Sequence, residues 1–378
     1  MKLISIEPTP SPNSMKINLS ESLPSGESKN FKKEQKAEAP AQLKKLLDID
    51  GVTGVFHVAN FIAVERHPKK DWQEILQHVR QVFGEESFEN GKNASEQPDD
   101  SFGEAKVLLQ VFRGIPMQIK VETGGEETRF GLAERFTMAA MKAESASDNL
   151  VMERQWKEYG VRYGDIEEIG KEVEEELEAA YDQSRLDRLV NEAFNKNAGE
   201  QEQVKTISSQ EVKEALQNSD WKVRFAALEK LNPKEEDIEL LGSVLKDDKA
   251  SIRRLATVYL GMIEIEDVLP YIYQALKDSS VTVRRTAGDC LSDLGFSKAI
   301  PAMIEALNDK NKLVRWRAAM FLYELGDETA IEALRAAEDD PEFEVSLQVR
   351  MALKRIESGE EAAGSVWQQM TNARKNES

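Results

Sequence analysis

Apolar residues recur with helical spacing through the second half of the chain. In four segments a valine or isoleucine precedes an arginine, with alanine three positions after the arginine and leucine seven positions after it. These three apolar side chains share one helix face. The arginines are Arg224, Arg253, Arg284 and Arg315, separated by 29, 31 and 31 residues. A repeat of this length is typical of stacked helical hairpins.

The pattern therefore predicts an all-α solenoid over residues 204–357. The arginines lie on the second helix of each unit, and a fifth, weaker unit contains Val349-Arg350. A capping box of Ser208 and Glu211 opens the array. The first helices of the units are predicted at residues 209–216, 237–245, 268–276, 299–307 and 330–336.

The N-terminal part alternates apolar and polar residues, as half-buried strands do. Strands are expected at 2–7, 15–19, 52–58 and 61–65, with helices at 41–48 and after Asp71. Residues 20–40 are polar and are expected to be mostly loop. This pattern predicts a small α+β domain over residues 1–84.

A second α+β domain is expected over residues 104–200, after a polar, acidic linker at 85–103. Strands are predicted at 105–112 and 115–123, with Gly124-Gly125 in a hairpin turn, and a helix is predicted at 132–142. Residues 148–197 read as mostly helical. A further linker at 195–203 and a frayed tail at 358–378 complete a multi-domain fold class of α+β head, α+β middle and all-α array.

An aspartate precedes each repeated arginine by a few residues: Asp220, Asp248, Asp278 and Asp309. Such an aspartate can cap its helix and can also pair with an arginine of its own or a neighbouring unit. A structural Asp–Arg ladder is the favoured interpretation. An anion-binding row on the concave face is the alternative.

The residue after each repeated arginine is expected to point away from the core. Aromatic residues and arginine gather there, and these residue types dominate the energetics of protein interfaces. Met320 and Tyr323 lie one and two turns further on. We call the whole set the concave strip and treat it as a candidate protein-binding surface, with local packing as the alternative: Phe225, Arg254, Arg285, Trp316, Met320 and Tyr323.

The net charge of −19 and the lack of a basic segment argue against nucleic acid as a partner, because counterion release needs clustered Lys and Arg. No run of apolar residues is long enough to cross a membrane, and the N-terminus lacks a signal-peptide core. A single cysteine, Cys290, suits a reducing compartment. The cytoplasm is therefore the expected location.

The sequence contains no recognisable catalytic or phosphate-binding motif. Metal binding is not expected, because the spacing of His57, His67 and His78 does not require them to converge. Cys290 is expected to be a buried, inert thiol, and the acidic run 172–178 a solvated helix with one buried side. No catalytic residue and no cofactor are assigned.

The repeated V-R-x-x-A segments resemble short HEAT repeats, which form α-solenoids. Thr9–Lys16 (TPSPNSMK) and Leu46–Val64 resemble the N-terminal domain of Nfu/NifU scaffold proteins. That resemblance implies partner docking near iron–sulfur assembly without cluster binding, because a C-x-x-C module is absent. Together the parts resemble the conserved virulence factor C family of Firmicutes, which implies a link to virulence-factor expression.

Three hypotheses for the function follow. The chain is expected to be a non-enzymatic adaptor that binds protein partners through the concave strip and the head. The first alternative is an accessory role in iron–sulfur cluster assembly or delivery. The second is an enzyme with a site between middle domain and solenoid, for which Arg113, Arg129 and Glu134 are conceivable members. The partner's identity and the oligomeric state stay open.

Overall fold

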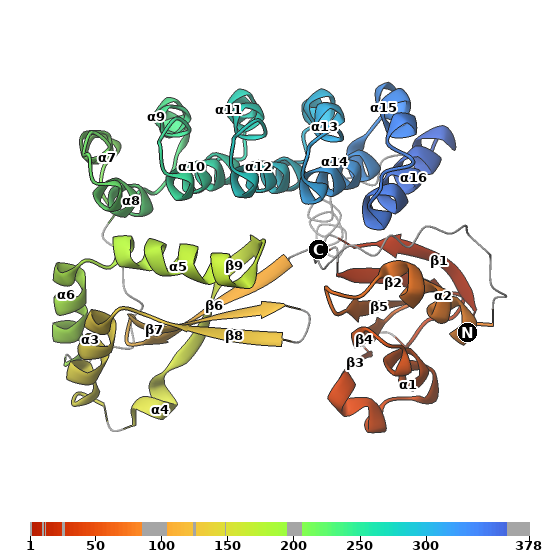
Figure 1. The fold of residues 1–378 in the computed structure, drawn as a ribbon, viewed down its shortest axis with the longest axis horizontal. Coiled ribbons are helices and arrows are strands. Elements are labelled where there is room, and N and C mark those ends of the chain that lie inside the picture. The colour runs from red at the N-terminus through yellow and green to blue at the C-terminus, as the bar shows by residue number, and fades with distance from the viewer. Residues whose placement is uncertain are drawn as a thin grey trace.

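A computed structural model describes residues 2–9, 11, 13–24, 27–84, 104–123, 126–147, 149–194 and 206–360. The predicted linkers at 85–103 and 195–203 and nearly all of the predicted tail at 358–378 lie outside these residues, as does the predicted Gly124-Gly125 turn. The predicted fold class is confirmed. The chain has an α+β head, an α+β middle domain and a C-terminal helical array (Figure 1).

The head is an antiparallel five-stranded sheet with the strand order β1-β2-β5-β4-β3. Buried side chains of α1 and α2 pack with the alternating apolar residues of β2, β4 and β5 in one core. The elements are β1 (Leu3–Pro8), β2 (Ser14–Leu19), β3 (Ser28–Lys32), α1 (Ala41–Asp48), β4 (Val52–Val58), β5 (Phe61–Arg66) and α2 (Trp72–Val82). Asp71 accepts a hydrogen bond from the backbone N–H of Gln73 and so caps α2.

The prediction that residues 20–40 are mostly loop is wrong over 28–38. This segment forms the edge strand β3 and a short 3₁₀ helix, Lys33–Glu38. The strand pairs with β4 on one side only, and its side chains are exposed or half-buried. An edge strand of this kind carries almost no apolar alternation, so the pattern gave no signal for it.

The middle domain is a four-stranded antiparallel sheet with the order β8-β7-β6-β9. Helices α3, α5 and α6 share one core with strands β6 and β7. The elements are β6 (Glu104–Phe112), β7 (Ile115–Thr123), β8 (Glu126–Gly131), α3 (Glu134–Glu144), α4 (Leu150–Glu153), β9 (Gln155–Tyr163), α5 (Ile166–Ala180) and α6 (Gln183–Ala193).

Residues 148–197 are mostly helical, as predicted, but strand β9 lies within them and is not predicted. Eight residue pairs join it to β6, with a register shift opposite Val107 and Leu108. Gly160, with φ of 121°, lies at this irregularity. The irregularity breaks the two-residue alternation, and four of the nine side chains are exposed, which removes the usual strand signal.

The array consists of five helical hairpins stacked in register, close to the predicted limits. The first helices are α7 (Ser209–Ala215), α9 (Ile238–Val244), α11 (Leu269–Ala275), α13 (Ile300–Ala306) and α15 (Ile331–Ala336). The second helices are α8 (Trp221–Glu229), α10 (Ala250–Met262), α12 (Val281–Leu294), α14 (Lys312–Leu325) and α16 (Phe343–Glu357). Pro270 and Pro301 occupy the first turns of α11 and α13, where the missing N–H costs little.

Each repeated arginine forms a two-point ion pair with an aspartate of the next unit. The Nε-to-carboxylate distance is 2.7 Å in all four pairs: Arg224–Asp247, Arg253–Asp278, Arg284–Asp309 and Arg315–Asp340. The same aspartate accepts a backbone N–H two residues on, at 2.7–2.9 Å. One carboxylate therefore fixes the turn that leads into its own helix and ties that helix to the preceding unit.

This arrangement supports the predicted Asp–Arg ladder and corrects its members. The partner of Arg224 is Asp247 and not the adjacent, predicted Asp248. Asp220 accepts the N–H of Lys222 and so caps α8. Val223, expected in the core stripe, is 42% exposed. It belongs to the first unit, which has no preceding unit to cover it.

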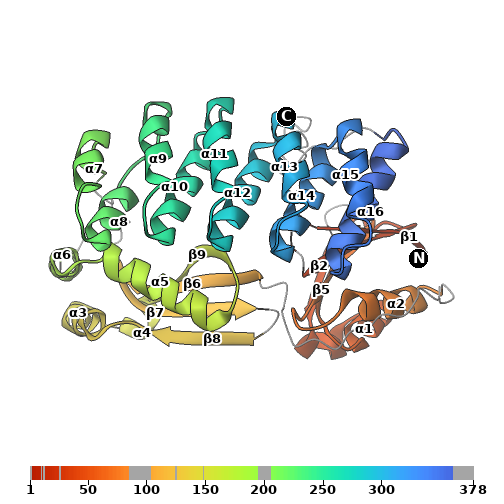
Figure 2. The ribbon, with the colours of Figure 1, turned by 45° about the horizontal axis from the view of Figure 1, so that its top comes forward.

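The second helices α8, α10, α12 and α14 face the two α+β domains, while the first helices lie on the opposite side (Figures 1 and 2). At the far end of the array, Arg66 of β5 forms a buried ion pair with Glu344 of α16 at 2.6 Å. Phe343 and Leu347 pack against the core of the head there. The array thus contacts both domains with its concave face.

Candidate functional site between the middle domain and the array

Helix α5 of the middle domain lies along the start of the concave face (Figure 2). Ala179 and Ala180 of α5 share a buried apolar cluster with Phe225 and Leu228 of α8. Lys222 pairs with Glu178, and Lys249 pairs with Glu175, both at 2.7 Å. Apolar packing flanked by ion pairs therefore holds α5 on the first two units.

Glu176 is the centre of the contact. Its side chain is fully buried, and its carboxylate accepts from Arg254 Nη2 at 2.8 Å, Arg162 Nη2 at 3.1 Å and Tyr159 Oη at 3.2 Å. Burial alone raises the pKa of this carboxyl, but the charges of Arg254 and Arg162 outweigh burial and lower it. Glu176 is thus held as a carboxylate between two nearly buried arginines.

The pKa of the neighbouring Glu172 shifts in the opposite direction. Burial, and then the charge of Glu176, raise its pKa. Glu176 lies between Val173 and Leu177 on the buried side of α5. The interpretation of residues 172–178 as a solvated helix face is therefore wrong at Glu176.

Arg285 of α12 is 1% exposed and lies over the ring of Tyr163 from β9, with its guanidinium carbon 4.2 Å from the ring centroid. The same guanidinium carbon is 5.6 Å from the ring centroid of Trp316. Asp289 pairs with Arg285 at 2.7 Å and with Arg317 at 2.8 Å. Strand β9 is thereby fixed against the middle of the array.

The expectation that the concave strip is open to a partner is wrong. Phe225, Arg254, Arg285, Trp316 and Met320 are all less than a tenth exposed, and Tyr323 is half-buried. For the first three, α5 and β9 of the same chain cover them.

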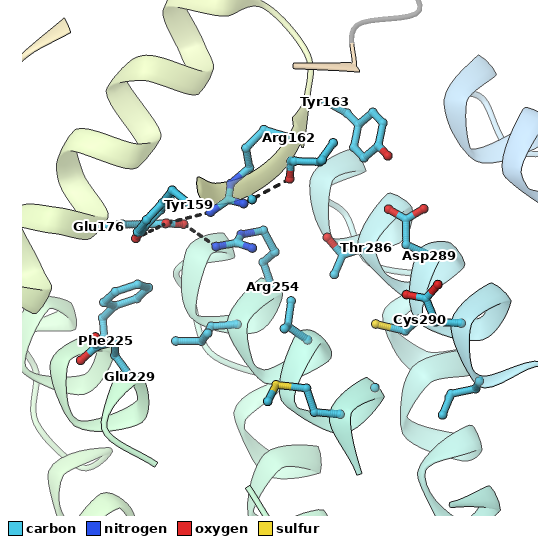
Figure 3. Close-up of a pocket in the computed structure, with 18 of the residues that line it drawn as sticks. Tyr159, Arg162, Tyr163, Glu176, Phe225, Glu229, Arg254, Thr286, Asp289 and Cys290 are labelled. Atoms are coloured by element: carbon cyan, nitrogen blue, oxygen red, sulfur yellow. Dashed lines mark hydrogen bonds and ion pairs between the residues drawn. The ribbon is translucent and has the colours of Figure 1, made fainter. Parts of the chain in front are cut away.

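A cleft of about 730 Å³ remains between β9, α5 and the helices α8, α10 and α12. Its apolar wall includes Leu255, Val258, Met262 and Leu294, and Val161 lies on the β9 side. Figure 3 shows Arg162 and Arg254 converging on Glu176 on one side, with Asp289 and Cys290 on α12 opposite. A concave site at a domain interface, apolar with a few polar groups, is the usual setting for ligand binding.

The charged groups of the cleft are mostly engaged within the protein. Glu229 pairs with Arg185 at 3.3 Å, and Asp289 and Glu176 have the partners given above. Burial, followed by the charges of Asp289 and Asp293, raises the pKa of the Cys290 thiol. Such a thiol is protonated at neutral pH and is a poor nucleophile, which agrees with the inert thiol predicted from the sequence.

Full-length relatives identify the family. A protein named conserved virulence factor C from Staphylococcus haemolyticus is 48% identical over 99% of this chain and 100% of the relative. Its counterpart in Staphylococcus aureus strain MRSA252 is 51% identical over 98% and 99%. The chain belongs to the conserved virulence factor C family. The Bacillus subtilis protein YpgR is 63% identical over 99% of both chains.

Three family models match parts of this family member. They are the Nfu/NifU scaffold N-terminal domain over residues 4–91, a virulence factor domain over 110–190 and HEAT repeats over 269–354. Both resemblances noted in the sequence are thus confirmed. The chain is a helical-repeat protein of a virulence-factor family.

Solved structures are similar to smaller parts of the chain. Protein SAV1430 of Staphylococcus aureus is 40% identical over 22% of this chain and 99% of its own, with a TM-score of 0.21. The CpcE–CpcF phycocyanin lyase complex of Nostoc is 27% identical over 31% of this chain and 53% of its own, with a TM-score of 0.27.

The residues named for a possible enzyme site lie elsewhere. Arg113 pairs with Glu153 at 2.7 Å, Arg129 pairs with Glu127 at 2.7 Å, and Glu134 begins α3. None of the three lines the cleft. The cleft lies between the middle domain and the array, where the enzyme alternative expects a pocket, but Glu176 and Asp293 of its lining are not among the predicted residues. Helical spacing within α5 and α12 was the available signal for them.

The three histidines are dispersed in the head. His57 is buried in β4, with a pKa lowered by burial and then by Lys29. His67 lies 3.4 Å from Glu126, and His78 lies 2.8 Å from the carbonyl of Glu74. Within the described ranges, no three His, Cys, Asp or Glu side chains gather as a metal site. Nor does any helix among these residues have the length and hydropathy to cross a bilayer.

Proposed function

We propose that this protein is a non-enzymatic adaptor whose repeat array holds its own head and middle domain together and presents them to protein partners. The observation that carries the proposal is the occupied concave face. The array contacts the middle domain through Glu176 and its arginines, and the head through Arg66 and Glu344. The surface used for partners therefore lies on the domains that the array holds.

The chemistry of the cleft supports a role without catalysis. An acid–base group needs a pKa near the working pH and a free position for substrate. Glu176 is held ionised, with both oxygens bound by arginine. Among the described residues, the ionisable groups that shift the pKa of Cys290 are the acids Asp289 and Asp293, and both disfavour the thiolate.

The middle domain carries a suitable partner surface on its outer helix. Met138 and Met141 lie one turn apart on α3 and are 50% and 65% exposed. Methionine side chains adapt to different partners, and exposed apolar groups on one face are typical of interaction surfaces. Helix α3 packs on α6 and β7 with its opposite face, which carries Phe136, Ala139, Ala140 and Ala143.

Proximity labelling in the native cell tests this role. We expect the double variant Met138→Ser, Met141→Ser to lose a defined set of labelled proteins, and the purified protein to bind one of them directly. Met262→Ser is the matched control, because Met262 is 58% exposed but lies in the cleft. If the labelled set is the same in all three proteins, the α3 surface is not the adaptor surface.

A second role is favoured by the Nfu/NifU match over residues 4–91. We propose it as docking near iron–sulfur assembly, with the cluster carried by another protein. The protein purified without oxygen should then be colourless and free of iron, yet retain an iron–sulfur assembly protein when the head is intact. Iron bound at one equivalent or more per chain would contradict the docking-only role.

A further inference from the structure

The cleft between the middle domain and the array has two kinds of wall. One part of the lining is apolar, and two of its side chains are unusually exposed: Met262 of α10 at 58% and Val161 of β9 at 40%. Leu255, Val258 and Leu294 continue the same surface. Removing such a surface from water stabilises a complex by roughly 25 cal/mol per Å², so the apolar part of a ligand is favoured here.

The charged wall is acidic. Five carboxylates and two arginines are among the described lining residues: Glu176, Glu229, Glu264, Asp289, Asp293, Arg162 and Arg254. Both arginines are committed to Glu176. An anionic ligand would therefore have to compete with a fully buried carboxylate for them.

Two of the carboxylates remain available. Within the described part of the chain, Asp293 and Glu264 form no ion pair, whereas Glu229 and Asp289 do. Asp293 lies one turn after Asp289 on α12, and like charges at this spacing repel each other. Burial and then the charge of Asp289 raise the pKa of Asp293 and outweigh the charges of Arg317 and Arg285, which lower it; a bound cation would act in the same direction as these arginines.

We propose that this cleft binds a small cationic amphiphile, an ammonium group on an apolar chain. The apolar chain lies on Met262, Val258 and Leu255, and the ammonium group lies at Asp293 and Glu264. This inference goes beyond the adaptor role and does not depend on it.

Cys290 provides a reporter for occupation of the cleft. It lines the cleft beside Asp289, it is half-buried, and it is the single cysteine of the chain. Because the thiol is protonated at neutral pH, it reacts slowly, so the reaction with a thiol reagent is run at alkaline pH and its rate is compared with that of the chain without ligand. A ligand that fills the cleft lowers this rate, and mass spectrometry of the intact protein measures the modified fraction.

The test compares n-octylammonium, octanoate and 1-octanol at equal concentrations on the full chain. We expect saturable protection of Cys290 by octylammonium, weaker protection by octanol and none by octanoate. Asp293→Asn should weaken the binding of octylammonium by about fivefold, which is the upper range for the loss of a partly exposed ion pair. Asp339→Asn is the matched control, because that side chain is 96% exposed in the last unit, and it should leave protection unchanged.

Several results would overturn the proposal. Equal protection by octanol and octylammonium would show that the positive charge does not contribute to binding. Protection by octanoate alone would show that the cleft prefers an anion. If octylammonium gives no protection, it does not bind in the cleft. If it protects the Asp293→Asn variant as well as the parent, its ammonium group does not bind at Asp293. Asp293 is exposed at the cleft, so its replacement is compatible with folding.

Discussion

Replacing Glu176 by glutamine tests how the middle domain is held on the array. The carboxylate is fully buried and joins Arg162 of β9 to Arg254 of α10. The replacement keeps the shape and one acceptor oxygen but removes the charge. Two guanidinium groups, each less than a tenth exposed, then lose the carboxylate that they contact, and the more distant Glu172 is the remaining carboxylate whose charge acts on both.

Removing one partner of a buried ion pair costs about 3–5 kcal/mol. We expect about 3 kcal/mol for Glu176→Gln, because the remaining oxygen still accepts one hydrogen bond. Arg254→Gln should cost less, since the pair between Glu176 and Arg162 survives it. Glu175→Gln is the matched control on the same helix. Its pair with Lys249 has side chains 31% and 37% exposed, and half-exposed pairs are worth about 0–1 kcal/mol.

Hydrogen exchange at the amides of α5 and β9 measures this cost as a free energy of local opening. The predicted order of loss of protection is Glu176→Gln, then Arg254→Gln, then Glu175→Gln. If Glu176→Gln changes protection by no more than Glu175→Gln, the buried ion cluster does not hold the two parts together, and the reasoning is refuted.

Three further predictions concern the ladder and the head. Arg284→Lys loses the two-point contact with Asp309 and should lower stability by about 1–3 kcal/mol, seen as a lower urea midpoint of the helical circular dichroism signal; an unchanged midpoint would contradict the ladder. Burial alone raises the pKa of Asp278, but the hydrogen bond from its arginine partner gives a net lowering. The stability that this pair contributes is thus fully present above pH 3.8, the ordinary pKa of the carboxyl group, and is lost as the pH falls through the lowered pKa. Asp278→Asn should therefore flatten the acid side of the pH–stability curve, and a slope equal to that of the parent would disprove this prediction. Glu344→Gln leaves Arg66 buried and unpaired, and should release the head and increase the radius of gyration in small-angle X-ray scattering; an unchanged radius would show that this pair does not hold the head.

The helical array could be predicted from the sequence because each unit uses local contacts. The spacing of Arg224, Arg253, Arg284 and Arg315 located the second helices, and the aspartates indicated the ladder. The choice between Asp247 and Asp248 could not be made, since adjacent residues at a helix start are equally able to cap it. Their side chains leave the backbone in different directions, and only the stacked neighbour selects one.

The concave strip shows the limit of reading a surface from a repeat. Segments of the same chain that are distant in the sequence cover its first positions. Glu176, for example, contacts Arg254 and is 78 residues away from it in the sequence. Arginine and aromatic side chains suit an interface within one chain as well as one between chains. Strand β9, which supplies Arg162 and Tyr163, was itself hidden by its irregularity at Gly160.

Zero-length cross-linking of the protein in solution measures the central claim directly, because a carbodiimide joins only a lysine and a carboxylate already in contact. The account predicts cross-linked peptides between Lys249 and Glu175 and between Lys222 and Glu178, whose atoms are 2.7 Å apart across the interface. The pair Lys32–Glu65, 2.6 Å apart within the head, is the internal control. If the control cross-link forms and neither interdomain cross-link does, the concave face is open in solution and the account is contradicted.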